Sequence, residues 1–238
     1  MRLALPSMTL VGRVLAVLLA ILGTGRIGIG LFAWKTANAL ERPDYTVLRA
    51  LGRGVELREY KPYVIAETTI AAPTMKAGTG KGFQTVAGYI FGKNKPSKKM
   101  AMTAPVRISA KTGGAQMAMT APVRTEASNG KTKVSFVLEK AYDTRTAPRP
   151  LDSKVRLKDV RPHLLAARKF SGPPPTEARV ERERARIIAA LAENGLQPDT
   201  SVDTMVYGYH DPFITPNWLR RNEVVVRVRD TGAARATA

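Results

Sequence analysis

The feature that most constrains the fold is an internal similarity between residues 55–70 and residues 155–170. The two segments read VELREYKPYVIAETTI and VRLKDVRPHLLAARKF, and they align without a gap at a constant offset. Valine, leucine, proline and alanine recur at matching positions, and most remaining pairs keep their charge or apolar character. Such agreement at a fixed offset predicts an internal duplication.

Each copy predicts a strand, a bend at proline and a second strand, because β-branched and apolar residues flank a proline that a central ladder would not accommodate. A helix is expected after each copy, where apolar residues recur at helical spacing and a glycine follows. Strands are expected again at 133–138, 204–209 and 224–228. The predicted fold class is therefore α+β: duplicated ββαβ-type units forming an antiparallel or mixed sheet with two helices.

The chain has 238 residues, of which 44% are hydrophobic and 24% charged, so it can bury a core. We expect one folded domain over residues 40–230, with pseudo-repeats at about 45–140 and 150–229. Residues 231–238 are expected to form a disordered tail.

Residues 1–39 lack any acidic residue and are largely apolar, which is atypical of a globular domain. Two interpretations remain open: a signal peptide ending at the small residues Ala37-Asn38-Ala39, or an uncleaved helix that spans a bilayer. Both predict an exported protein that is either periplasmic or anchored in the cytoplasmic membrane by this segment.

The net charge of +19 predicts an anionic partner. No nucleic-acid-binding motif accompanies the charge, so nucleic acid is not the expected partner. The basic run Lys93, Lys95, Lys98 and Lys99 is either a solvated loop or a contact for an anionic membrane surface or ligand carboxylates. The chain contains no Cys and two His, which excludes thiolate chemistry and makes a multi-histidine metal site unexpected.

A shorter repeat lies within the first half. Residues 100–107 and 117–124 both read MAMTAPVR, and Lys111-Thr112-Gly113-Gly114 between them indicates a turn. A hairpin would bring the two copies together. Their methionines either fill a core or form a polarisable surface suited to a flat apolar ligand.

Five motifs in order carry a resemblance to a known family. They are VELREYKPY at 55–63, GFQTVAGYIFGKN at 82–94, the paired MTAPV segments, FSG at 170–172 and RRNEV at 220–224. In this combination the chain resembles the SOUL haem-binding proteins. The resemblance implies a distorted barrel with two helices, shared with gyrase-inhibitor-like effector-binding domains. It also implies non-covalent binding of haem or another tetrapyrrole in an apolar cleft beside the first helix, without catalysis.

A tetrapyrrole site needs a flat apolar wall and cations for the propionates. The alternative is that the apolar residues are core and the cations are solvated. The candidate residues are Phe83, Val86, Ala87, Ile90 and Met75 for the wall, Arg58, Lys76 and Lys81 for the propionates, and Met102 and Met119 as further contacts.

An axial iron ligand is not evident. Glu59 occupies the position where some family members carry a histidine, and His163 and His210 are more often structural in such contexts. No catalytic residue and no metal ligand are predicted. The leading hypothesis is a haem or tetrapyrrole carrier, buffer or sensor. The alternatives are a non-haem small-molecule-binding module and an enzyme acting on an apolar ligand through Glu59 or another acid.

Overall fold

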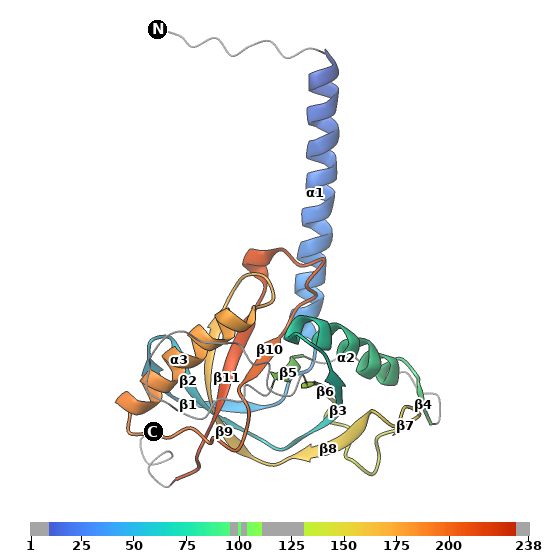
Figure 1. Ribbon diagram of the computed structural model, residues 1–238. Coiled ribbons are helices and arrows are strands. Elements are labelled where there is room, and N and C mark those ends of the chain that lie inside the picture. Colours follow the sequence, from blue (N-terminus) through green and yellow to red (C-terminus); the bar gives the residue numbers. More distant parts are fainter. Residues whose placement is uncertain (1–9, 96–99, 101–103, 111–130, 232–238) are drawn as a thin grey trace.

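The computed structural model describes residues 10–95, 100, 104–110 and 131–231, and Figure 1 shows their arrangement. Side chains are described from Gly25 onward, except those of 108–110. In chain order the elements are α1 (Leu10–Ala39), β1 (Tyr45–Gly52), β2 (Val55–Tyr60), β3 (Tyr63–Ala71), α2 (Met75–Ile90), β4 (Asn94–Lys95), β5 (Val106–Ala110), β6 (Lys131–Val137), β7 (Arg149–Pro150), β8 (Arg156–Val160), β9 (His163–Phe170), α3 (Glu177–Glu193), β10 (Met205–Gly208), a 3-10 turn (Asn217–Leu219) and β11 (Asn222–Val228).

Nine strands form one sheet in the order β1-β2-β9-β11-β10-β5-β6-β3-β8, and every pairing in it is antiparallel. The α+β class and the antiparallel sheet are therefore confirmed. The barrel is not: β1 and β8 remain unpaired edges of the sheet in the described part of the chain. The two helices expected after the similar segments are α2 and α3, and α1 precedes the sheet as a third.

The two similar segments form equivalent elements. Pro62 separates β2 from β3, Pro162 separates β8 from β9, and α2 and α3 follow. The equivalent strands pair crosswise, β2 with β9 and β3 with β8. The strands and helices expected from the pattern are thus present, while the duplication itself stays a prediction.

The helices α2 and α3 lie on the same face of the sheet (Figure 1). The strand register shows the same arrangement. Val134 packs under α2 and Val206 packs under α3, and both are paired with Ile108 of β5, so the two valines lie on one face of the sheet. The opposite face carries a third cluster rich in tyrosine, with Tyr60, Tyr207 and Tyr209 buried.

Glycine lets α2 approach the sheet closely. A Cβ atom at Gly82 would lie 2.5 Å from Val134 Cγ2, and one at Gly78 would lie 2.4 Å from Thr132 Oγ1. At Gly80, about half a turn from both and on the outer side of the helix, a Cβ atom would meet nothing within 4 Å. Two of the glycines are therefore required by packing, and the third is not.

Gly82→Ala is expected to destabilise the protein, whereas Gly80→Ala is expected to stabilise it. Overpacking a tight contact costs about 1–3 kcal/mol, and Ala in an exposed helix position gains about 0.5–1 kcal/mol over Gly. Urea denaturation of both variants measures the two changes. Equal shifts in the two variants would contradict the close packing of α2 on β6.

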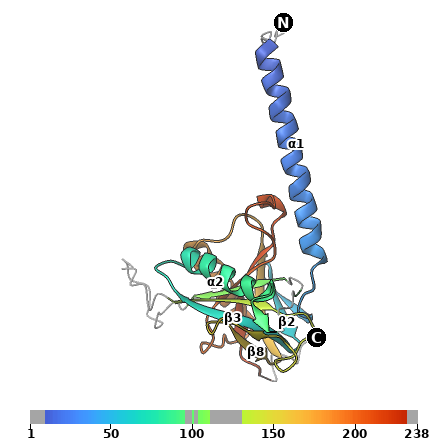
Figure 2. The ribbon, with the colours of Figure 1, turned by 90° about the vertical axis from the view of Figure 1, so that its right-hand side faces the viewer.

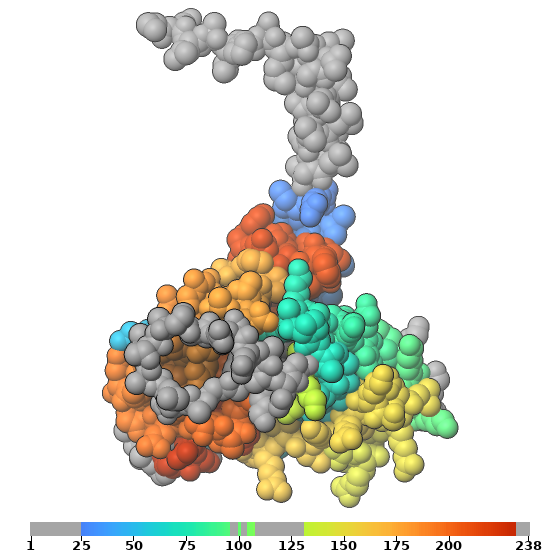
Figure 3. All heavy atoms as spheres, in the orientation of Figure 1, coloured from blue at the N-terminus to red at the C-terminus, as the bar shows by residue number. Residues whose placement is uncertain are grey.

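Helix α1 extends away from the sheet and helices as a single rod (Figures 1 and 2). Near its end Gly30 lies against Pro216, whose Cδ would be 2.7 Å from an added Cβ, and in Figure 3 the segment between β10 and β11 covers the base of the helix. The expectation of an exported or membrane-anchored protein does not stand. Within the described residues, no helix combines the length and the apolar character needed to cross a bilayer.

Several predicted features lie outside the described residues. They include the second MAMTAPVR copy, Met102, Lys98, Lys99, the predicted turn at 111–114 and all but the first residue of the tail.

Candidate functional site

The predicted tetrapyrrole wall lies on α2, which begins at the N-cap Thr74, whose hydroxyl accepts a hydrogen bond from the Ala77 N–H. Val86, Ala87 and Ile90 point into the core and are buried beneath the helix. Phe83 remains 40% exposed and contacts the Phe136 ring at a centroid distance of 5.2 Å. The helical face was predicted, but three of its four apolar side chains contact the sheet instead of lining a surface cleft.

Lys76, Gly80 and Phe83 form an exposed strip along α2, because residues at i, i+4 and i+7 share one side of a helix. Met75 is half-buried against the α3 cluster, and its N–H donates to Glu177 Oε1 at 2.9 Å. The predicted Met102 and Met119 lie outside the described residues.

A groove of about 580 Å³ runs beside α2. Lys81 contributes to it from the helix, and Lys93 and Lys154 add two further amines. Asp152 supplies the one carboxylate among its described lining residues. Lys154 was missed by sequence reasoning, because it lies in a loop far along the chain with no motif around it.

Arg58 was predicted to pair with a propionate, but in the structure it pairs with carboxylates of the protein itself. Its side chain is 2% exposed on the sheet face opposite to α2, where it pairs with Glu223 at 2.9 Å and with Glu56 at 2.7 Å. Arg221 binds the same Glu223 carboxylate at 2.7 Å, and the Tyr209 hydroxyl donates to it at 2.8 Å. Burial disfavours the Glu223 carboxylate, yet the two arginines and Tyr209 hold the pKa of Glu223 below its ordinary value.

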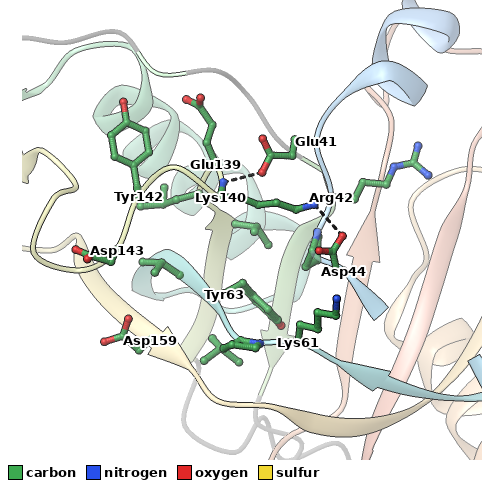
Figure 4. A pocket seen from close by; sticks show the side chains of 16 residues that line it. Glu41, Arg42, Asp44, Lys61, Tyr63, Glu139, Lys140, Tyr142, Asp143 and Asp159 are labelled. Carbon is green, nitrogen blue, oxygen red and sulfur yellow. Dashed lines mark hydrogen bonds and ion pairs between the residues drawn. The ribbon is translucent and has the colours of Figure 1, made fainter. Parts of the chain in front are cut away.

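A second cavity, of about 440 Å³, lies where the segment after α1 meets the ends of β3, β6 and β8 (Figure 4). Its apolar lining residues include Val64, Val137 and Val160. The ionisable lining residues are five acids, Glu41, Asp44, Glu139, Asp143 and Asp159, and three bases, Arg42, Lys61 and Lys140.

Lys140 links two of the segments that line this cavity, the one after α1 and the one after β6. Its Nζ lies 2.8 Å from Asp44 Oδ1, and its backbone N–H donates to Glu41 Oε1 at 2.6 Å. The Lys140 hydrogen bond lowers the pKa of Asp44, and the N–H groups of Thr146 and Arg145 lower the pKa of Asp143. These carboxylates are therefore charged at neutral pH and would repel propionates. The residues that line this cavity come from segments far apart in the sequence, so no local sequence pattern predicted it.

The two histidines have structural surroundings. His163 is 3% exposed, and its Nδ1–H donates to the Arg161 carbonyl at 2.7 Å. His210 Nδ1 accepts from the Arg221 N–H at 3.0 Å. Among the described residues no group of three His, Asp or Glu side chains could hold a metal ion.

Solved structures share this fold at low identity. The EcmrR C-terminal domain matches with a TM-score of 0.53 and 9% identity, covering 79% of this chain and 99% of that one. A conserved protein from Listeria innocua matches with a TM-score of 0.53 and 10% identity, covering 74% and 93%. These similarities concern the fold alone.

Sequence comparison identifies a relative and a family. Human heme-binding protein 2 is 28% identical over 195 residues, which cover 79% of this chain and 86% of the relative. The family described as SOUL heme-binding protein matches residues 40–227. Because that match spans most of the chain, this protein belongs to the SOUL heme-binding protein family.

Proposed function

We propose that the protein binds haem or another tetrapyrrole non-covalently and carries, buffers or senses it. Membership of the SOUL family over residues 40–227 is the observation that carries this proposal. The name of the human relative, heme-binding protein 2, supports it. The unit that binds the ligand is the domain of residues 40–230.

The exposed strip of α2 is the proposed contact surface. Phe83 offers an exposed ring for stacking, and the open side of Gly80 lets a flat macrocycle approach the helix. Lys76 lies seven residues before Phe83, about 10 Å along the helix axis, and can meet a propionate at the edge of the macrocycle. Lys81 opens onto the neighbouring amine-lined groove, which suits the second propionate.

Other predicted residues support this surface indirectly. Val86, Ala87 and Ile90 fix α2 on the sheet, and Met75 fixes its first turn against α3. Arg58 is left out of the proposed contact set, because it is buried and paired with Glu223. Met102 and Met119 remain predicted contacts, and a role for Lys93 and Lys95 at an anionic membrane surface remains a prediction.

The proposal includes no axial iron ligand. His163 is buried against Tyr60 on the sheet face opposite to α2, so apolar contact and charge pairing would hold a ligand on the α2 strip. A free-base porphyrin is then expected to bind about as tightly as haem.

A non-haem small-molecule-binding module is the second candidate. The cavity of Figure 4 favours it, because apolar lining residues with five acidic side chains against three basic ones suit a ligand that carries a cation rather than propionates. Native mass spectrometry of the protein from its host would reveal such a ligand.

Hemin titration of the full chain is expected to give a saturable Soret shift. A triple variant, Lys76→Gln, Lys81→Gln and Phe83→Ala, is expected to bind roughly tenfold to hundredfold more weakly, since it loses two ion pairs and one stacked ring. The charge-matched control is Arg156→Gln with Lys169→Gln, at exposed strand positions. No saturable shift in the wild type would refute tetrapyrrole binding; equal affinity in the triple variant would refute only this site.

A further inference from the structure

Arg107 lies in the middle of the sheet face opposite to the helices. Register places it in a cross-strand row that runs from Glu67 on β3 through Ser135 on β6 and Arg107 on β5 to Tyr207 on β10. Directly opposed residues in antiparallel strands share one face, so each of these four side chains neighbours the next one in the row.

The Arg107 guanidinium has incomplete partners within the described residues. Its Nη2 donates to Met205 Sδ at 2.9 Å, and its Cζ lies 5.6 Å and 5.7 Å from the ring centroids of Tyr63 and Tyr207. Its Nε and Nη1 are buried without a hydrogen-bond partner, and the buried hydroxyls of Tyr63 and Tyr207 also lack one. Buried polar groups are rarely left in this state, because each costs the full penalty of desolvation.

Arg58 on the same face shows what a buried arginine ordinarily has. It forms two hydrogen bonds to Glu223 and one to Glu56. Two carboxylates lie two strands from Arg107 in the same row, and both have other partners: Glu67 is bonded to Lys158 on β8, and Glu223 is bonded to Arg58 and Arg221. An arginine stays protonated in proteins, so a buried guanidinium keeps its charge and the desolvation penalty that comes with it. An anion in contact with the guanidinium would supply the partner that Arg107 lacks among the described residues.

A cavity of about 210 Å³ adjoins the guanidinium. Besides Arg107, its lining includes Lys133 and Ser135, whose amine and hydroxyl can donate to an oxyanion, and Ser201, whose hydroxyl already donates to Asp199 Oδ1 at 2.6 Å. Glu67 and Asp203 also line it, so with Lys158 the neighbourhood holds three cations against two carboxylates. The volume admits a small anion and is too small for a tetrapyrrole.

We propose that the cavity beside Arg107 binds a small oxyanion, either a carboxylate or a phosphate, with Arg107 as its counter-ion and Lys133 and Ser135 as further donors. The site is separate from the α2 strip and lies on the other face of the sheet. It therefore does not depend on tetrapyrrole binding.

Thermal unfolding of the full chain in acetate, inorganic phosphate or chloride, at equal ionic strength and pH 7, tests the proposal. Acetate or phosphate is expected to raise the Tm saturably above the chloride value, and the anion that does so at the lower concentration identifies the class. Arg107→Met is expected to weaken the apparent affinity at least tenfold. It should also raise the Tm in chloride, because it removes a buried charge that has no counter-ion.

Arg53→Met is the matched control, since Arg53 is exposed and pairs with Glu193 away from the cavity. It should keep the wild-type response to anions. Lys133→Gln, at an exposed strand position, is expected to weaken the affinity severalfold and decides the question if Arg107→Met does not fold. Equal Tm values in all three salts, or a full anion response in both cavity variants, would overturn the proposal.

Discussion

Replacing Arg58 with methionine is expected to lower the free energy of unfolding by about 3 kcal/mol. The substitution leaves the Glu223 carboxylate, which is 0% exposed, with Arg221 and Tyr209 but without its most buried partner. Breaking a buried ion pair on one side typically costs about 3–5 kcal/mol, and the lower end applies here because Arg221 remains. Urea denaturation followed by circular dichroism measures the change.

Two further variants make this result specific. Arg53→Met removes an exposed partner of Glu193 and is expected to cost less than about 1 kcal/mol. Adding Glu223→Gln to Arg58→Met neutralises the stranded carboxylate, so the double variant is expected to recover part of the lost stability. If Arg58→Met and Arg53→Met lowered the free energy of unfolding by the same small amount, the buried ion pairs of Glu223 would not stabilise the fold as their geometry indicates.

Sequence patterns predicted the local elements well. The segments 133–138, 204–209 and 224–228 were expected as strands, and β6, β10 and β11 overlap them. The helix after each similar segment was predicted from apolar spacing, and Gly92 and Gly195 follow the two helices with positive φ. These features depend on periodicity and backbone preference, which a short window of sequence contains.

The partners of charged side chains could not be predicted in the same way. Arg58 was expected at a ligand rim, yet it pairs with Glu223, 165 residues away. Only the pairing of β2 with β9 and of β9 with β11 brings the two together. Likewise, helical spacing predicted the shared face of Val86, Ala87 and Ile90 but not whether a sheet or a ligand covers it.

Lowering the pH from 7 to 4 is expected to cost roughly 3 kcal/mol of stability through His163 alone. Burial lowers the pKa of His163 to about 4; its bond to the Arg161 carbonyl opposes the shift, and the charges of Arg227 and Arg107 add to it. Tyr60 stacks on the ring at 5.5 Å, so water cannot easily solvate an imidazolium there.

The direction follows from proton counts in the two states. At pH values between the unfolded pKa of about 6.5 and the folded pKa of about 4, His163 is protonated in the unfolded chain and neutral in the folded protein. Stability is therefore complete above pH 6.5 and falls by about 1.4 kcal/mol per pH unit down to about pH 4. Urea denaturation at several pH values measures this slope.

His163→Phe removes the titrating group while keeping an aromatic ring against Tyr60. Its stability is expected to fall less steeply than that of the wild type between pH 6.5 and 4, whatever its stability at pH 7. His210→Gln serves as the comparison, because burial also lowers the pKa of His210 and its contribution must be separated. An unchanged slope in His163→Phe would mean that folded His163 accepts a proton readily, which its 3% exposure and the charges of Arg227 and Arg107 make costly.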